Sequence, residues 1–467
     1  MKYSIFLFSI SFLCLNASAQ LRYTLKYQDS TSPVLKISIE PSSPLTAPVS
    51  FIMPRSVPGT YGVTFYDRFI TNIYAINNRG EKIAMSKNEN DAPRWIYADS
   101  GKQIARIEYE VNLNKIERNA APSDASIIRP GFTGILNYSV FGWIEGTEKQ
   151  HVQCTINTFD NWSIFSTNQP TTQLAKGSFE ISTESYNVLA DGQIFMGTNF
   201  RVKEFKGVTP LFVASYCQTE NEWLDDYGLQ ETMSMKILKD YFGELPFQHY
   251  SVMLIKSLPL EPGNYPPFGM EHLNSSTFFG DTTSLRRSAM SLDEVKRTMP
   301  TFLHHMGHSL IPLRCYGDTY RPYVQEIPPI INNIWFNEGF MWFLPYDELK
   351  LPRMKTNFDN SVYNTSPEIK KLSLQQLSQA ASTMYSADFR LGRGVYSRGA
   401  LMAIEMNNYL KEKTGGKKSM KDVFRYLYQW SKKNNRPFTM EEFPLLINKA
   451  CNIDLSKIYK KWQLPIE

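Results

Sequence analysis

Two histidines four residues apart, and a glutamate further along the chain, constrain this sequence more than any other feature. His304 and His308 lie where apolar residues recur at helical spacing, and Glu338 follows within Trp335-Phe-Asn-Glu-Gly-Phe340. Side chains four residues apart share one face of a helix, so both imidazoles can point at one ion. Two imidazoles and a carboxylate from a second helix form a catalytic zinc set with an open fourth position. We therefore predict that His304, His308 and Glu338 bind one Zn²⁺; the alternative is that they pack a core without metal.

The residue after the first histidine departs from the H-E-x-x-H signature of zinc peptidases. That signature uses its glutamate as the general base for the metal-bound water, and here the position is His305. A histidine can act as a base, because its unperturbed pKa is about 6.5. It lacks, however, the negative charge that would orient water or a substrate ammonium group. Three interpretations stay open: loss of catalysis, an adapted base, or an extra metal ligand. The last is disfavoured because adjacent helical residues differ by about 100° in direction.

Composition and charge exclude some classes of function. The chain has 467 residues, long enough for two or three domains, and is 42% hydrophobic and 20% charged, which is typical of globular proteins. Its net charge is only +5 and no long run of lysine or arginine occurs. A nucleic-acid partner is therefore not expected.

The N-terminus predicts an exported protein. Lys2 precedes an apolar run, and Ala17-Ser-Ala19 follows it, as in a secretory signal peptide cleaved after residue 19. No second apolar run is long enough to span a membrane, so we expect a mature chain without a transmembrane segment, periplasmic or extracellular. Export leaves disulfides open, but the spacing of the four later cysteines predicts no pairing. These cysteines are Cys154, Cys217, Cys315 and Cys451.

The hydrophobic pattern divides the mature chain in two and predicts an α+β protein. Residues 20–217 show short alternating segments broken by turn signals, which predict an all-β domain of sandwich type. Residues 218–467 are β-rich to about 290 and mostly helical from 291 to 467. Gly415-Gly416 predicts the end of the helix that follows Tyr396, and Ser419 with Asp422 predicts the start of another. Thr439 with Glu442 predicts a third.

Five short motifs, in order along the mature chain, carry a family resemblance. The sequence resembles the glycyl aminopeptidase family of gluzincin zinc metallopeptidases, in which a thermolysin-like domain lies between a β domain and a PDZ domain. The chain ends where the family's catalytic domain closes, so we expect the PDZ domain to be absent. The motifs are Pro54-Arg-Ser-Val-Pro-Gly-Thr-Tyr61 (family W-x-P-G-x-Y), Phe268-Gly-Met-Glu-His272 (G-G-L-E-H), Trp335–Phe340 (L-W-F-x-E-G-F), Val395-Tyr-Ser-Arg-Gly-Ala400 (Y-x-K-G-A) and the closing Asn452–Tyr459.

The resemblance implies further site residues. Tyr396 would donate to the oxyanion of a reacting carbonyl; the alternative is an ordinary helix aromatic. Gly269, Met270, Glu271 and His272 would form the substrate-binding segment after an edge strand at Tyr250–Lys256, with Glu271 on the substrate's α-amine. A tight turn with a surface carboxylate is the alternative.

The resemblance also implies peptide bonds as the substrate class and peptide or protein N-termini as partners. Three functions remain: an exported zinc aminopeptidase, an inactive pseudopeptidase that binds peptides, and an interaction protein that uses only its β domain. The paired histidines argue against the first, and the intact ligand set argues against the third. Neither the physiological substrate nor the oligomeric state follows from the sequence.

Overall fold

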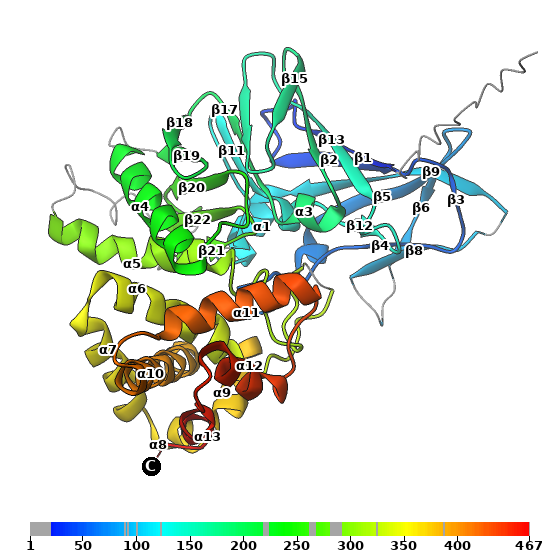
Figure 1. The fold of residues 1–467 in the computed structure, drawn as a ribbon. Helices are drawn as coiled ribbons and strands as arrows, with labels where there is room; N and C mark the ends of the chain where they lie inside the picture. The colour runs from blue at the N-terminus through cyan, green and yellow to red at the C-terminus, as the bar shows by residue number, and fades with distance from the viewer. Residues whose placement is uncertain are drawn as a thin grey trace, which may run out of the picture.

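A computed structural model describes most of the chain after residue 19, and it has two parts (Figure 1). The described residues are 20–87, 90, 93–99, 101–121, 124–217, 224–260, 268–280, 292–323, 326–385 and 388–466. The expected signal peptide, residues 1–19, lies outside this range. Strands fill the N-terminal part and helices the C-terminal part, which confirms the predicted α+β class.

Three sheets build the N-terminal part. Burial alternates along their strands: in β1 the side chains of Leu21, Tyr23 and Leu25 are buried, whereas Arg22 and Lys26 are exposed. This alternation buries one face of the sheet and confirms the predicted sandwich-like domain. The largest sheet has nine strands in the order β15-β16-β13-β1-β2-β9-β5-β6, with β3 beside β9. Its members are β1 (Gln20–Lys26), β2 (Val34–Glu40), β3 (Leu45–Thr46), β5 (Ile70–Asn77), β6 (Lys82–Ala84), β9 (Gln103–Asn112), β13 (His151–Asn157), β15 (Thr171–Ala175) and β16 (Ser178–Thr183).

The two smaller sheets have four strands each, and short helices connect the strands. One sheet runs β10 (Ile127–Arg129), β11 (Phe132–Leu136), β17 (Gln193–Gly197), β14 (Ser163–Ser166). The other runs β12 (Trp143–Ile144), β4 (Val49–Ile52), β8 (Arg94–Tyr97), β7 (Ser86–Lys87). The helical connections are the 3-10 turn η1 (Tyr66–Phe69), α1 (Leu113–Asn119), α2 (Asn137–Val140) and α3 (Tyr186–Ala190).

A fourth sheet of five strands links the two parts. Its order is β18 (Arg201–Lys206), β19 (Pro210–Cys217), β20 (Tyr250–Lys256), β22 (Ser275–Gly280), β21 (Phe268–Glu271). It therefore continues across the expected domain boundary at residue 217. The predicted edge position of Tyr250–Lys256 is wrong: β20 lies at the centre and is buried throughout. β18 and β21 are the edge strands, and residues 269–271 of β21 lie in the predicted substrate-binding segment.

Helices form the rest of the molecule. α4 (Leu224–Phe242) packs against β19, and α5 (Leu292–His308) packs against β21 and β22. Gly415, at φ 59°, closes a long helix that already contains Tyr396 rather than following it. The predicted capping box of Ser419 and Asp422 is confirmed, and Thr439 and Glu442 bond each other's backbone at 3.1 and 2.9 Å. The later helices are α6 (Met341–Leu349), α7 (Pro352–Tyr363), α8 (Pro367–Lys370), α9 (Leu374–Met384), α10 (Phe389–Thr414), α11 (Met420–Asn434), α12 (Glu442–Cys451) and α13 (Ser456–Gln463).

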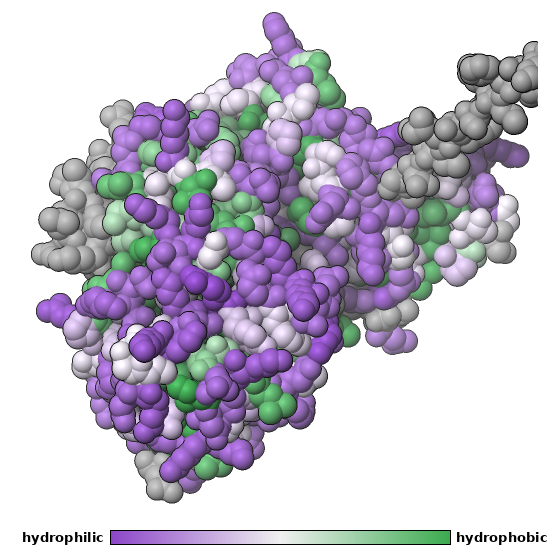
Figure 2. All heavy atoms as spheres, in the orientation of Figure 1, coloured by the Kyte–Doolittle hydropathy of each residue, from purple (hydrophilic) through white to green (hydrophobic). Residues whose placement is uncertain are grey.

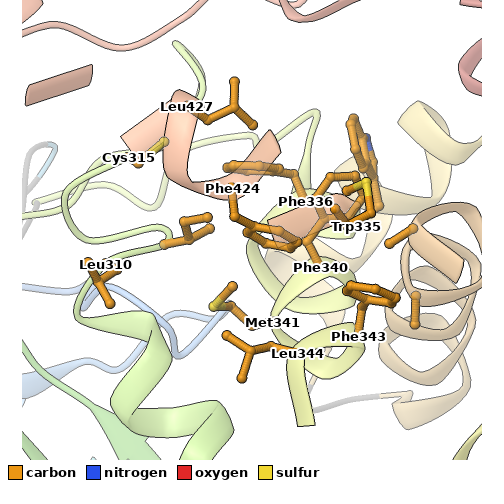
Figure 3. Close-up of a cluster of buried hydrophobic side chains, with 14 of the residues drawn as sticks. Leu310, Cys315, Trp335, Phe336, Phe340, Met341, Phe343, Leu344, Phe424 and Leu427 are labelled. Carbon is orange, nitrogen blue, oxygen red and sulfur yellow. The ribbon is translucent and has the colours of Figure 1, made fainter. Parts of the chain in front are cut away.

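An aromatic core holds the segment that carries Glu338. That segment is a π-helical turn, η3 (Trp335–Phe340), and its Phe336 and Phe340 point into the core (Figure 3). Phe340 packs on Phe424 of α11 at 5.6 Å between ring centroids, and Phe343 stacks on the same ring at 6.2 Å. Close-packed aromatic rings leave such a turn little freedom, so the core fixes the direction of Glu338.

The described helices were compared with the length and apolar character of a membrane span. None of the helices in the described parts of the chain combines the length and apolar character that a span requires. Figure 2 shows a largely hydrophilic face on which apolar residues gather only in small groups. Within the described residues, Cys154, Cys315 and Cys451 form no disulfide.

A buried carboxylate in α4 gives the first prediction. Glu231 is fully buried, and neither carboxylate oxygen has a hydrogen-bond partner among the described residues. Burial raises the pKa of Glu231 well above its usual value, so folding loses stability as pH rises from about 4.5 towards the folded-state pKa. We expect Glu231→Gln to leave stability unchanged near pH 4 and to increase it at pH 8 by about 1–3 kcal/mol. Denaturant unfolding at both pH values measures this; an equal effect at both would contradict it.

Candidate metal centre

Helix α5 places both predicted histidine ligands in the interior. His304 is 3% exposed and His308 is 1% exposed, one helical turn apart. The buried side chains of Leu303 and Met306 anchor the helix in the hydrophobic core. The two Nε2 atoms lie 2.9 Å apart, so the imidazoles converge on one point.

Glu338 completes the group from the π-helical turn η3. Its Oε2 lies 3.3 Å from Nε2 of His304 and 3.4 Å from Nε2 of His308. Single-turn π-helices occur often at functional sites, because the extra residue redirects a side chain. The ligand atoms of these three residues all lie within 4.8 Å of one another. The structure thus brings together the three residues predicted to bind zinc.

These separations fit a zinc ion. Around a tetrahedral ion with bonds of about 2.0–2.2 Å, neighbouring ligand atoms lie roughly 3.3–3.6 Å apart. The observed separations of 2.9, 3.3 and 3.4 Å need only small adjustments to meet that geometry. The donor set of two imidazoles and a carboxylate is one of those that hold zinc at open sites.

Neighbouring groups orient the ligands. Nδ1 of His308 lies 2.9 Å from the carbonyl oxygen of Ile311, to which its N–H donates, so Nε2 remains the metal-facing nitrogen. The ring of His304 stacks on Trp342 with centroids 4.1 Å apart. Such outer contacts fix ring orientation before a metal binds.

Charge is shared unequally between the ligands. Burial disfavours a charged imidazole, but the carboxylates of Glu271 and Glu338 outweigh it and raise the pKa of His308 to about 9. Burial, together with the positive charge of His308, lowers the pKa of His304 to about 3. Burial would raise the pKa of Glu338, yet His308 and His304 hold it well below its usual range. The buried carboxylates of Glu271 and Glu338 therefore favour a positive charge between them and the histidines, which a divalent cation can supply.

His305 faces the edge strand β21. Its Nδ1 lies 3.4 Å from Oε2 of Glu271, and its ring packs edge-on against Phe278 at 5.4 Å. A Cβ on Gly269 would lie 2.5 Å from Nε2 of His305, so only glycine leaves room for this imidazole. Glu271, His305 and His308 form a second group of ligand atoms within 4.8 Å. The two groups are not independent sites, because both contain His308.

The predicted substrate-binding segment divides between two faces of β21. Gly269 and Glu271 face the metal ligands, as alternation along a strand requires. Met270 points the other way, where its sulfur accepts a hydrogen bond from Tyr138 at 2.8 Å. His272 is fully buried, with Nδ1 3.1 Å from Asp191 in the β domain. Met270 and His272 therefore pack the domain interior, and only Gly269 and Glu271 are available to a ligand.

Two glycines allow close packing between η3 and the helix that carries Tyr396. Gly339 of η3 and Gly399 of α10 touch, and a Cβ on Gly339 would lie 2.5 Å from the Cα of Gly399. This contact brings Tyr396, one turn before Gly399, towards Glu338. Burial and the negative charge of Glu338 raise the pKa of Tyr396 well above its usual value of 10, so its hydroxyl stays protonated.

One residue at the centre has no predicted role. Tyr61, from the N-terminal domain, donates a hydrogen bond from its hydroxyl to Oε1 of Glu338 at 2.7 Å. Its ring also meets Tyr385 of the helical part at 6.3 Å. The only sequence signal for Tyr61 was its place in the Pro-Gly-x-Tyr motif.

Comparison with known proteins finds one matching domain family and several solved structures of similar fold. Residues 22–198 match the model of the peptidase M61 N-terminal domain family. No curated protein matches the chain. Among solved structures, an aminopeptidase N family protein from Idiomarina loihiensis superposes with a TM-score of 0.81 at 17% identity, over 96% of this chain and 76% of the other.

Two structures of an M1 zinc metallopeptidase from Deinococcus radiodurans share the fold less closely. The first has a TM-score of 0.54 at 13% identity, and the match covers 96% of this chain and 94% of the other. The second, a mutant bound to a Tyr-Ser-Ala substrate, has a TM-score of 0.55 with the same identity and coverage. At such identities the likeness concerns the fold.

Proposed function

We propose that this chain, a gluzincin-like peptidase by its M61 N-terminal domain and its M1-like fold, is an exported zinc metallopeptidase-like protein that acts on or binds peptide N-termini. The observation that carries the proposal is the convergence of His304, His308 and Glu338 within 3.4 Å. Bound zinc would activate water and polarise a carbonyl group. The expected signal peptide supports export to the periplasm or the outside of the cell.

Glu271 is the anchor for a substrate's N-terminal ammonium group. It is 5% exposed, and its Oε1 has no hydrogen-bond partner among the described residues. A buried carboxylate oxygen without a donor is costly, and an ammonium group satisfies it by a charge-assisted hydrogen bond. Edge strand β21 can at the same time pair with the substrate backbone, because one of its sides is free of a neighbouring strand in the described chain.

Tyr396 and His305 determine whether binding leads to hydrolysis. The protonated hydroxyl of Tyr396 can donate to the oxygen of a reacting carbonyl. A general base must reach the attacking water, and His305 instead directs Nδ1 towards Glu271. This contact favours a second candidate, a pseudopeptidase that binds peptides without turnover.

The test separates N-terminal recognition from catalysis. We expect a glycine-initiated peptide with a free N-terminus to bind more tightly than its N-acetylated form, because only the first carries an ammonium group for Glu271. Glu271→Gln should weaken binding of the free peptide about 10–100-fold and leave the acetylated peptide unchanged. Calorimetry gives both dissociation constants, and chromatography of the mixture reports cleavage.

Equal affinities for the two peptides would reject N-terminal recognition. Cleavage by the wild-type protein, lost with the metal, would instead reject the pseudopeptidase alternative. Sequencing the N-terminus of the secreted protein tests export, with Gln20 as the expected first residue.

A further inference from the structure

A turn of the N-terminal domain enters the metal centre. The turn closes where Thr60 donates to the carbonyl oxygen of Val57, from N at 3.3 Å and from Oγ1 at 2.9 Å. Gly59, at φ +85°, meets Glu271 so closely that a Cβ would lie 2.2 Å from its Oε1. Tyr61 follows and bonds Glu338. One turn therefore contacts both carboxylates of the site.

The two carboxylate oxygens of Glu338 have different partners. Oε1 accepts from the phenol at 2.7 Å, whereas Oε2 faces both histidine nitrogens. Tyr61 is 4% exposed and Glu338 is 3% exposed, so water does not replace this donor easily. A carboxylate held at one oxygen presents the other to a metal in a single orientation.

The backbone of Tyr61 indicates that the surrounding structure imposes this position. Its φ is +45°, in the left-handed region that residues with a side chain rarely adopt. The ring is held between elements of both parts of the molecule, since it belongs to the core of the helical part and meets Tyr385. Such strain persists only where the surrounding structure enforces it, and the one polar side-chain atom of Tyr61 bonds Glu338.

From these contacts we propose that Tyr61 is a positioning residue of the metal centre: it holds Glu338 as a one-oxygen ligand, so the N-terminal domain completes the site. The inference rests on the proposed zinc site, and it adds that a residue of the N-terminal domain orients one of the zinc ligands. Without the phenol, Glu338 can rotate and offer both oxygens, which loosens the ligand set and changes the coordination number.

The experiment compares two tyrosines that each lose a buried hydrogen bond. Tyr61→Phe removes the donor to Glu338. Tyr66→Phe removes a bond of 2.9 Å to the carbonyl oxygen of Asp124, which is not a proposed zinc ligand. Zinc affinity is measured by competition with a chromophoric chelator on the full mature chain. We expect Tyr61→Phe to weaken zinc binding about 10–100-fold, the range for lost outer contacts, and Tyr66→Phe to change it less than about threefold.

Cobalt substitution supplies a readout that a merely structural role would not move. In the wild type and in Tyr66→Phe we expect the intense visible absorption of four-coordinate Co²⁺, and in Tyr61→Phe the weaker bands of a higher coordination number. Tyr61→Phe with wild-type affinity and spectrum, or equal loss in Tyr66→Phe, overturns the positioning role while leaving the zinc site intact. A wild-type chain that takes up neither metal overturns the zinc site and the positioning role together.

Discussion

Zinc is expected at close to one ion per chain in the purified mature protein and to be absent from the double variant His304→Ala/His308→Ala. The structure leaves no substitute for these two nitrogens: among the described residues, each group of three possible ligands contains His308. The double variant keeps no such group of three, and open zinc sites need three protein ligands. Affinity should therefore fall by more than roughly a thousandfold, since loss of a single outer contact already costs about 10–100-fold and this variant loses two ligands.

The matched control removes two histidines that do not contribute to the centre. His151 lies in β13 beside Ser182, and His249 lies next to the carbonyl oxygen of Thr167. His151→Ala/His249→Ala should keep its zinc by elemental analysis, and circular dichroism should show both double variants folded. Zinc retained after loss of His304 and His308 would place the ion elsewhere. If the wild-type protein contains no zinc, even after zinc has been added, the remaining interpretation is a binding protein that functions without metal.

Local patterns in the sequence were sufficient to place the two histidines together. Helical periodicity places His304 and His308 on one face whatever the rest of the chain does. Helix ends followed the same logic: Gly415 adopts the left-handed conformation that closes α10, and Ser419 with Asp422 caps the next helix. Each of these features depends on residues a few positions apart.

Strand order and contacts between domains depend on residues far apart in sequence, and these were not predictable. Tyr250–Lys256 has a continuous apolar run from Val252 to Ile255, and such a strand gives no sign of which neighbours it will have. Strand period did hold a usable signal, since it separates Gly269 and Glu271 from Met270 and His272. The bond between Tyr61 and Glu338 joins residues 277 positions apart, and no local pattern contains it.

His305→Glu is expected to give the largest gain of function. A glutamate at this position restores the general base of the H-E-x-x-H signature, next to the ligands that remain in place. General base catalysis contributes about 10²–10⁴-fold, so kcat/KM on glycine-initiated reporter peptides should rise by a factor in this range. The new carboxylate lies beside Glu271, and repulsion between the two should make the gain depend on a bound cation, either the metal or the substrate ammonium group.

Comparison with His305→Gln shows whether the base itself is responsible. Glutamine is similar in size to glutamate and also ends the contact of 3.4 Å between His305 and Glu271, but it accepts no proton. A gain in both variants would mean that freeing Glu271 improves substrate binding, and KM rather than kcat should then change. A gain only in His305→Glu, visible in kcat, would show that the rest of the catalytic site is intact and that His305 alone limits the chemistry. No gain in either zinc-loaded variant, on a panel of aminoacyl and dipeptide reporters, would mean that the site has lost more than its base; the edge strand and Glu271 would then serve binding without turnover.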